Sequence, residues 1–455
     1  MVFKPELLSP AGTAKSMRFA FAYGADAVYA GQPRYSLRTR NNEFNHLDIM
    51  ADAIVEAHKL GKKFYVASNI SAHNDKVRTY LRDMQAVIDM KPDALIMSDP
   101  GLIMMVRETW PEMPIHLSVQ SNAVNYATVR FWKRQGLTRV ILSRELSLEE
   151  MEEIRAECPD MELEVFVHGA LCIAYSGRCL LSGYLNHRDP NQGTCTNACR
   201  WKYNAYEARE VPTGDIVTAK EVTRLARTER LDPLTKTQDD IPVFLLEEQS
   251  RPGELMPAME DEHGTYIMNS KDLRAVQHIP RLVQMRMDCL KIEGRTKSHY
   301  YVARTAQVYR RAIDMAVSGE SFDDKSLMAQ LEHLANRGYT EGFYRRHVPQ
   351  EYQNYEQGVT TNPNQQFVGE VLSIDSDRGW AEIEVKNRFV QGDTMELITP
   401  SGNMTFVVDA IENMDGISVG AAPGSGHVVR IPLPVIPATG DDSRYALLMR
   451  HISHA

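Results

Sequence analysis

The sequence predicts an α/β protein, with a TIM-like (β/α)8 barrel followed by a small antiparallel β-barrel domain. Two observations predict this arrangement. From residue 6 to about residue 300, short β-rich runs alternate about eight times with helical segments, as in a parallel barrel. From residue 366 to residue 440, short runs of alternating polarity are separated by turn sequences such as "SDRG" and "PSGN". A doubly wound open sheet is the alternative for the first region.

Each predicted barrel strand is a short apolar run that leads into polar residues. The eight runs, in chain order, are "ELLSPAG", "ADAVYAG", "KKFYVASN", "DALIMSDPG", "PIHLSVQSN", "RVILSREL", "LEVFVHGAL" and "CLKIEGRTKS". The polar residues at their ends are Ser9, Tyr29, Asn69, Asp99, Gln120, Asn122, Arg144, Glu145, His168, Glu293, Arg295 and Lys297. The strands of a parallel barrel end at one mouth, where active sites lie, so these residues predict a functional mouth. For each single residue the alternative is a capping or loop-bonding role.

The segments between and after these strands set the expected domain boundaries. The sequence "SLEE" from Ser147 predicts a capping box at the start of one helix, and residues 300–347 are predicted to be helical. Residues 170–265 do not fit the strand–helix repeat and predict an insertion around the mouth, which contains the cysteine-rich stretch. We expect a barrel domain over 1–350, a linker over 351–365, the β domain over 366–440 and a tail over 441–455.

The composition resembles that of ordinary soluble globular proteins, with 43% hydrophobic and 24% charged residues among 455. The N-terminus lacks the basic start and apolar run of a signal peptide. No apolar run approaches the roughly 20 residues that span a bilayer. We therefore expect a cytoplasmic protein without membrane contact. The net charge of −9 gives no whole-molecule attraction for nucleic acid, although it leaves room for a local basic groove.

Four of the six cysteines are concentrated in 28 residues: Cys172, Cys179, Cys195 and Cys199. Cytosolic thiols stay reduced, which favours metal binding over disulfides. Four thiolates can hold a zinc ion or a 4Fe–4S cluster. The wide spacing of the first two cysteines favours the cluster, because structural zinc sites usually contain two tight pairs. Buried free thiols are the third possibility. Cys158 and Cys289 lie apart from this group and are predicted to be packing residues.

The stretch "EVFVHGALCIAYSGRCLLS" resembles the signature of the collagenase-like peptidase family. The resemblance covers nearly the whole chain and includes "DAVYAG", "LSVQSN", "KIEGRTKS" and the C-terminal β region. The stretch "GYLNHRDPNQGTCTNACRW" is similar to one branch of the family, which modifies tRNA.

This resemblance implies a 4Fe–4S cluster on the four cysteines and hydroxylation at C5 of the wobble uridine of tRNA. The reaction would proceed without molecular oxygen, with prephenate as the hydroxyl donor. In quinone-hydroxylating relatives the fourth cysteine lies near the equivalent of "IMNSKDL", which contains no cysteine here. Cys199 is then the natural fourth ligand.

Prephenate carries two carboxylates, so its pocket should present arginine or lysine side chains. The substrate-binding residues that we expect at the mouth are Arg38, Arg40, Asn69, Gln120, Arg144, Arg178, Arg295 and Lys297. The candidate catalytic side chains are His168, Tyr175 and Glu293. Glu293 would orient Arg295 and Lys297, and Tyr175 or Tyr29 would stack on a flipped base. Surface ion pairs are the alternative for the cations.

Basic clusters in "KEVTRLARTER", "VYRRA" and "FYRRH" predict phosphate contacts to the anticodon arm of tRNA. A solvated helix face is the alternative for each cluster. Two other functions remain open. The family name suggests a peptidase, although the chain has neither an H-E-x-x-H nor a G-x-S-x-G motif. The other possibility is a non-catalytic, zinc-stabilised RNA-binding protein.

Overall fold

The computed structural model describes most of the chain. The described ranges are 3–36, 42–70, 72–170, 272–334, 338–345, 365–434 and 440–452, together with seven strands between residues 174 and 267. The chain forms two compact units. Unit 1 is Met1–His168, Ala275–Leu334 and Asn362–Ala455, and unit 2 is Gly169–Arg274 and Ala335–Thr361.

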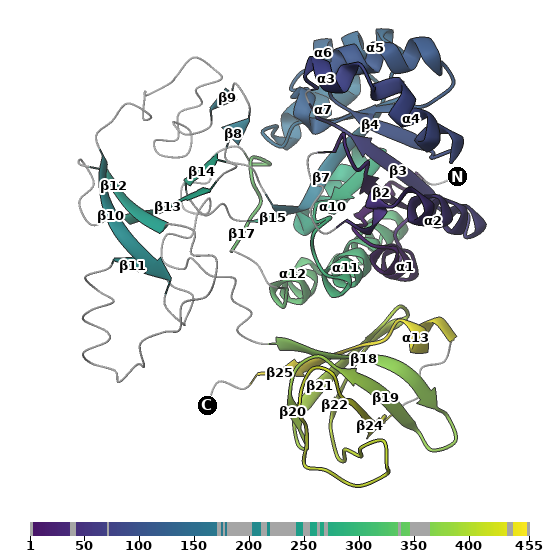
Figure 1. Ribbon diagram of the computed structural model, residues 1–455, viewed down its shortest axis with the longest axis vertical. Helices are drawn as coiled ribbons and strands as arrows, with labels where there is room; N and C mark the ends of the chain where they lie inside the picture. Colours follow the sequence, from purple (N-terminus) through teal and green to yellow (C-terminus); the bar gives the residue numbers. More distant parts are fainter. Residues whose placement is uncertain are drawn as a thin grey trace. The chain divides into compact units, whose positions relative to one another are not determined.

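Eight parallel strands in unit 1 form a closed barrel, which confirms the predicted fold class (Figure 1). They are β1 (Glu6–Pro10), β2 (Ala27–Gly31), β3 (Lys63–Ser68), β4 (Ala94–Met97), β5 (Ile115–Leu117), β6 (Arg139–Ile141), β7 (Glu162–Ala170) and β16 (Cys289–Ile292). Each strand from β1 to β6 pairs with the next in the chain. β16 closes the ring, because Cys289 lies opposite Glu164 of β7 on one side and Glu6 of β1 on the other.

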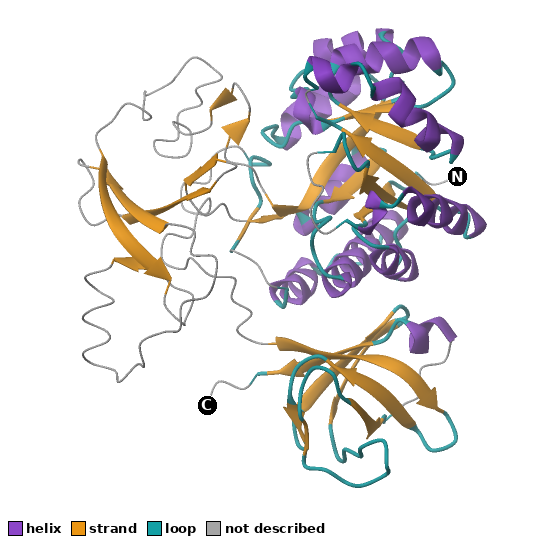
Figure 2. Ribbon diagram, in the orientation of Figure 1, coloured by secondary structure: helices purple, strands orange, loops and turns teal. Residues whose placement is uncertain are grey.

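Helices surround these strands (Figure 2). They are α1 (Ala14–Ala22), α2 (Leu47–Lys59), α3 (Asn74–Val77), α4 (Tyr80–Asp89), α5 (Pro100–Thr109), α6 (Tyr126–Arg134), α7 (Leu148–Glu157), α10 (Ile279–Gln284), α11 (His299–Ser318) and α12 (Asp324–Glu332), with short 3-10 helices η1 (Glu43–Asn45), η2 (Val119–Ser121) and η5 (Val276–His278). The predicted capping box is present at α7, where Ser147 and Glu150 bond reciprocally. None of the described helices is long and apolar enough to cross a membrane.

Unit 2 contains the cysteine-rich region. Its described strands are β8 (Ala174–Tyr175), β9 (Arg178–Cys179), β10 (Tyr203–Glu210), β11 (Ile216–Thr218), β12 (Val243–Glu248), β13 (Leu255–Asp261), β14 (Gly264–Ile267), β15 (Asp272–Arg274) and β17 (Tyr339–Thr340). Five of them form an antiparallel sheet in the order β11-β10-β12-β13-β14. The interruption of the strand–helix repeat in the sequence therefore corresponds to a separate antiparallel sheet.

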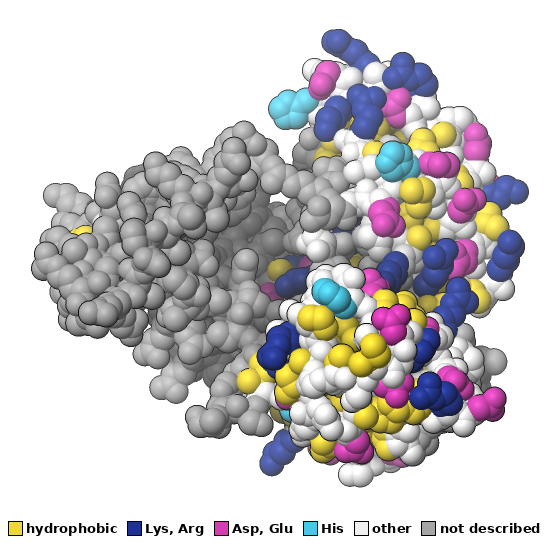
Figure 3. Space-filling model, turned by 60° about the horizontal axis from the view of Figure 1, so that its bottom comes forward, with side chains coloured by type: hydrophobic (Ala, Val, Ile, Leu, Met, Phe, Trp, Pro, Cys, Tyr) yellow, Lys and Arg dark blue, Asp and Glu magenta, His cyan; other side chains and the backbone are white. Residues whose placement is uncertain are grey.

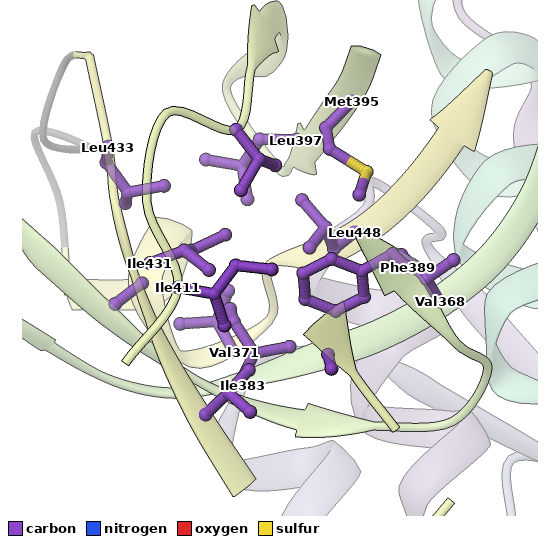
Figure 4. Packing of buried hydrophobic residues seen from close by; sticks show 14 of the residues in the cluster. Val368, Val371, Ile383, Phe389, Met395, Leu397, Ile411, Ile431, Leu433 and Leu448 are labelled. Carbon is purple, nitrogen blue, oxygen red and sulfur yellow. The ribbon is translucent and has the colours of Figure 1, made fainter. Parts of the chain in front are cut away.

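The C-terminal domain is antiparallel, as predicted. Its strands are β18 (Gln365–Asp375), β19 (Trp380–Val385), β20 (Phe389–Val390), β21 (Thr394–Thr399), β22 (Gly402–Val407), β23 (Ala421–Ala422), β24 (Val428–Pro432) and β25 (Leu447–His451), with a short helix α13 (Gly440–Arg444). Side chains such as Val371, Ile383, Phe389 and Leu397 point toward one another and form its apolar core (Figure 4). Every second side chain of a strand faces this core, which explains why apolar and polar residues alternate along the strands.

The expectation of a tail over 441–455 is wrong. Strand β25 lies between β18 and β21 in the six-stranded sheet, ordered β22-β21-β25-β18-β19-β24. Leu447, Leu448 and Met449 are fully buried there. The run "YALLMR" lacks the alternation of the other strands, because consecutive side chains are buried on both faces. The predicted linker, 351–365, lies outside the described residues except for its last position.

Helix α11 connects the barrel to the C-terminal domain within unit 1. Arg304, in the middle of this helix, is fully buried and donates to Glu396 of β21 at 2.6 Å. Gln307, one turn later, donates to the backbone oxygen of Thr399 at 2.8 Å. The same helix begins just after the loop that follows β16, so the C-terminal domain packs against an element that supports the barrel mouth.

Candidate functional site at the barrel mouth

Two arginines at the carboxyl ends of barrel strands lie on the faces of aromatic rings. Arg144 follows β6, and its guanidinium carbon is 3.8 Å from the ring centroid of Phe166 in β7. Arg295 follows β16, with its guanidinium carbon 5.8 Å from the ring centroid of Tyr29 in β2. Both side chains are about nine-tenths buried. A guanidinium held over a ring keeps a fixed plane, which favours planar, forked recognition of carboxylates.

Glu293 orients a cation at the mouth, but its partner differs from the predicted one. Its carboxylate lies 3.3 Å from Nη2 of Arg144, and the two side chains are 11% and 10% exposed. The backbone oxygen of Glu293 accepts a hydrogen bond from the hydroxyl of Tyr301 at 2.7 Å. The sequence places Glu293 nearest to Arg295 and Lys297, whereas barrel closure brings β6 and β16 close enough for the pair with Arg144.

Arg295 is held by a different contact. Its Nη1 donates to Oγ of Ser36 at 2.7 Å, in the loop that follows β2. The ring of Tyr29 beneath it is 4% exposed, and its hydroxyl donates to the backbone oxygen of Ile292 at 3.0 Å. On the same ring, Nζ of Lys291 is 4.4 Å from the centroid. Tyr29 therefore packs against two cations, which does not fit the expectation that it stacks on a flipped base.

Below the mouth, the lumen holds an ionic network that the sequence reasoning missed. Arg139 of β6 donates to Glu6 at 2.7 Å and to Glu164 at 3.2 Å, and Lys291 donates to the other oxygen of Glu164 at 2.8 Å. Glu6 also accepts from the hydroxyl of Tyr65 at 2.9 Å. The signal was present as charged residues inside apolar strands, as in "LEVF" and "CLKIE". Such barrels usually fill this space with branched apolar side chains.

This network shifts the protonation of its neighbours. Burial raises the pKa of the Glu6 carboxyl, but the attraction and hydrogen bonds of Arg139 and Lys63 outweigh it and lower the pKa to about 2. Burial, together with the positive charges of Arg139, Lys291 and Lys63, lowers the pKa of His116 well below its usual range. The charges in the lumen are thus fixed at neutral pH, with Glu6 ionised and His116 neutral.

His168 does not lie among the polar side chains of the mouth. It belongs to strand β7 rather than following it, and a bulge in the pairing with β16 places it opposite Ile292. Its Nδ1 is 3.3 Å from the hydroxyl of Tyr309 on α11, and its ring is 1% exposed. The bulge therefore turns the imidazole toward the helix, which corrects its expected position. A catalytic role for His168 stays a prediction.

The remaining described candidates occupy more peripheral positions. Asn69 is partly buried, and its side chain donates to Oγ of Ser118 at 3.4 Å. Gln120 and Lys297 are exposed, and Nζ of Lys297 lies 5.5 Å from the ring centroid of Tyr301. Asp99 caps helix α5 by accepting from the backbone of Leu102, which supports the capping alternative. Substrate contacts of Asn69, Gln120 and Lys297 stay predictions.

Several candidates lie outside the described residues or have only their backbone described. Those outside the described residues are Arg38, Arg40, Cys172, Cys195 and Cys199. For Tyr175, Arg178 and Cys179 only the backbone is described. Strands β8 and β9 pair so that Tyr175 lies opposite Arg178 and Cys179 lies opposite Ala174. Among the described residues, no group of three potential metal-ligating side chains occurs. The cysteine ligand set stays a prediction.

The predicted RNA contacts are also only partly described. Lys220, Arg224, Arg227, Arg230 and Arg346 lie outside the described residues. On α11, Arg310 is held by Asp26 and Asp314, whereas the neighbouring Arg311 is exposed. Both line a cleft of about 880 Å³ together with Gln307, Ser401 and Asn403.

The described surface shows no dominant positive patch in the view of Figure 3, where basic and acidic side chains are interspersed. Between residues 365 and 452, twelve acidic residues outnumber six lysines and arginines. The net charge of this segment therefore gives no overall attraction for phosphate.

The chain is a closed parallel barrel, with two arginines held over aromatic rings at its mouth, followed by an antiparallel C-terminal domain. It belongs to peptidase family U32. The family model matches residues 12–354, and the model of the peptidase family U32 C-terminal domain matches residues 363–444. Within the family, the chain is 62% identical over 452 residues to the tRNA hydroxylation protein P of Escherichia coli (strain K12), covering 99% of this chain and 98% of that protein.

Other proteins extend the comparison. The tRNA hydroxylation protein P of Haemophilus influenzae is 60% identical over 451 residues, covering 99% of this chain and 97% of that protein. A solved structure of the U32 peptidase Mk0906 is 14% identical and covers 48% of this chain and 87% of that one, with a TM-score of 0.33. That score is too low to support an argument about the mouth.

Proposed function

We propose that this protein hydroxylates C5 of the wobble uridine of tRNA to 5-hydroxyuridine, without molecular oxygen. Prephenate would be the hydroxyl donor, and a 4Fe–4S cluster would be held by Cys172, Cys179, Cys195 and Cys199. The main support is identity of 62%, over 99% of this chain, to a protein named for tRNA hydroxylation. Such a role places the protein in the cytoplasm, where tRNA is modified.

The mouth supports a dicarboxylate donor. Arg144 and Arg295 are two guanidinium groups, each with its plane set by an aromatic ring, and prephenate carries two carboxylates. Charge-assisted hydrogen bonds are strongest where water is largely excluded, and both side chains are about nine-tenths buried. In this proposal Arg144 and Arg295 bind and orient the donor, and Glu293 holds Arg144 in place.

The chemistry of the cysteines supports the choice of ligands. A metal ligand must be a thiolate, and burial raises the thiol pKa of both Cys158 and Cys289. Cys289 is fully buried in β16, and Sγ of Cys158 lies 3.6 Å from the backbone oxygen of Tyr126. Both suit packing, which supports a donor set made of the four clustered thiols. A bound cluster would supply electron transfer.

Nucleoside mass spectrometry of tRNA tests the activity directly. Cells that lack this protein should lose the 5-hydroxyuridine that it forms, and re-expression of the protein should restore it. Purified protein supplied with prephenate should form the same nucleoside in tRNA under anaerobic conditions. An unchanged nucleoside profile with a normal amount of bound tRNA would support the RNA-binding alternative. Cleavage of peptides without a change in tRNA would support the peptidase.

Metal analysis tests the cluster separately. Protein purified without oxygen should contain about four irons and four sulfides per chain. Cys172→Ala and Cys195→Ala should each lose iron together with tRNA hydroxylation. Stoichiometric zinc without iron after anaerobic purification would contradict the assignment.

A further inference from the structure

The position of Arg295 depends on a close approach between two loops and a strand. Its Nη1 lies 2.7 Å from Oγ of Ser36, which is 5% exposed. The loop that carries Ser36 is itself held, because the side-chain oxygen of Gln32 accepts from the backbone N–H groups of Arg34 and Tyr35, both at 2.7 Å. The hydroxyl of Ser36 is therefore a fixed acceptor for the guanidinium.

Gly31, the last residue of β2, makes room for this contact. A Cβ atom added at Gly31 would lie 2.5 Å from Nη1 of Arg295 and 2.6 Å from Oγ of Ser36. Carbon atoms do not approach nitrogen or oxygen so closely without displacement. Gly31 is not among the glycines with positive φ, so an added side chain would conflict with its neighbours for lack of space rather than because of the backbone conformation.

The strand at Gly31 cannot easily shift to relieve such a clash. Its carbonyl oxygen accepts from Nδ2 of Asn42 at 3.0 Å, and the next residue, Gln32, donates to the backbone oxygen of Ala67 at 2.9 Å. The side chains of Arg295 and Ser36 would therefore have to move instead. An added methyl group would tilt or translate the guanidinium and break its bond to Ser36.

We infer that Gly31 and Ser36 are positioning residues that set the plane of the Arg295 guanidinium for one carboxylate of an anionic co-substrate. This inference rests on the proposed function, because it assigns Arg295 to the hydroxyl donor. The donor class is a small dicarboxylate, whose second carboxylate meets Arg144. Bidentate recognition depends on the plane of the guanidinium, so a small displacement weakens binding without removing any charge.

Gly31→Ala tests the inference, with Gly420→Ala as the matched control. A Cβ added at Gly420 meets nothing within 4 Å, and its φ is also ordinary. We expect Gly31→Ala to raise the prephenate concentration needed for half-maximal hydroxylation at least tenfold, the scale of losing a charge-assisted contact. The turnover number at saturating prephenate, the affinity for tRNA and the iron content should match those of the control.

A double-variant cycle distinguishes positioning from a general structural effect. If Gly31 acts through Arg295, Gly31→Ala should not raise the prephenate requirement of Arg295→Ala any further, because the guanidinium that the methyl group would displace is already absent. Independent, multiplying effects of the two substitutions would overturn the inference. The inference would also be overturned if Gly31→Ala and Gly420→Ala needed the same prephenate concentration for half-maximal hydroxylation.

Ser36→Ala provides a second variant that adds no volume, for use if Gly31→Ala does not fold. It removes the acceptor of the 2.7 Å bond and should also raise the prephenate requirement, again without changing tRNA affinity. An unchanged requirement in this variant would contradict the inference. If the unaltered protein neither binds prephenate nor hydroxylates tRNA, the proposed function itself fails, and that result is seen before any variant is compared.

Discussion

The two ends of the barrel lumen hold charged side chains in contrasting ways. Deep in the lumen, Arg139 and Lys291 lie within hydrogen-bonding distance of carboxylates, and Glu164 bridges the two. At the mouth, Arg144 forms a longer ion pair with Glu293, at 3.3 Å, and Arg295 donates to the neutral hydroxyl of Ser36. Loss of one partner from the lumen network would leave a buried charge uncompensated, whereas in the proposed function the arginines at the mouth bind an incoming anion.

This contrast predicts that substitutions deep in the lumen change stability and that substitutions at the mouth change the response to substrate. Buried ion pairs contribute little net stability when intact, but removal of one partner leaves an uncompensated charge. The following experiments test the contrast, from the largest expected effect to the smallest.

Arg139→Met should have the largest effect on stability. It leaves Glu6 and Glu164 with one cation fewer in a buried site, which typically costs about 3–5 kcal/mol. Chemical denaturation should show this loss. The control is Arg130→Met, whose ion pair with Glu157 is about half exposed and should contribute less than about 1 kcal/mol. Equal, small losses in both variants would mean that the network is not important for folding.

Acid should destabilise the lumen network next. The folded-state pKa of Glu6, about 2, lies below its ordinary value of 4.5, so its contribution is complete above pH 4.5 and is lost as pH falls toward 2. A shift of this size corresponds to about 3 kcal/mol. The free energy of unfolding should be measured at a series of pH values between pH 5 and pH 2. As the pH falls, it should decrease less steeply for Glu6→Gln than for the unaltered protein. Parallel curves would contradict the prediction.

Arg144→Lys should change function with little change in stability. Lysine can keep the ion pair with Glu293, but it cannot offer the planar fork that a carboxylate binds. The prephenate concentration for half-maximal hydroxylation should rise about tenfold, the scale of one charge-assisted contact. Arg134→Lys, on the exposed end of α6, is the matched control and should behave like the unaltered protein. A large drop in the denaturation midpoint of Arg144→Lys would remove the contrast between the two ends.

Cys158→Ala and Cys289→Ala should have the smallest effect on activity. Both thiols are buried packing groups, and removal of one sulfur atom from a core costs stability rather than chemistry. Each variant should keep its iron and roughly half or more of its hydroxylation activity, because the substitution affects stability and not the reacting groups. Loss of iron from folded Cys289→Ala would show that the ligand set has been chosen wrongly.

The sequence by itself determined the eight barrel strands and their order. The eight barrel strands and the capping box at Ser147 are local patterns, because strand burial and helix capping depend on residues a few positions apart. The same reasoning identified Arg144, Glu293 and Arg295 as residues at strand ends. It could not identify their partners, because local periodicity does not encode which strands meet when the barrel closes.

The tertiary structure alone decided which side chains meet. Glu6, Arg139, Glu164 and Lys291 are far apart in the sequence, and only the closure of β16 onto β1 and β7 brings them into one network. A one-residue bulge turned His168 toward α11, since each added residue reverses the face of a strand. The space at Gly31 exists only because the loops after β2 and β16 converge there. These contacts depend on register and closure, which are long-range properties of the folded chain.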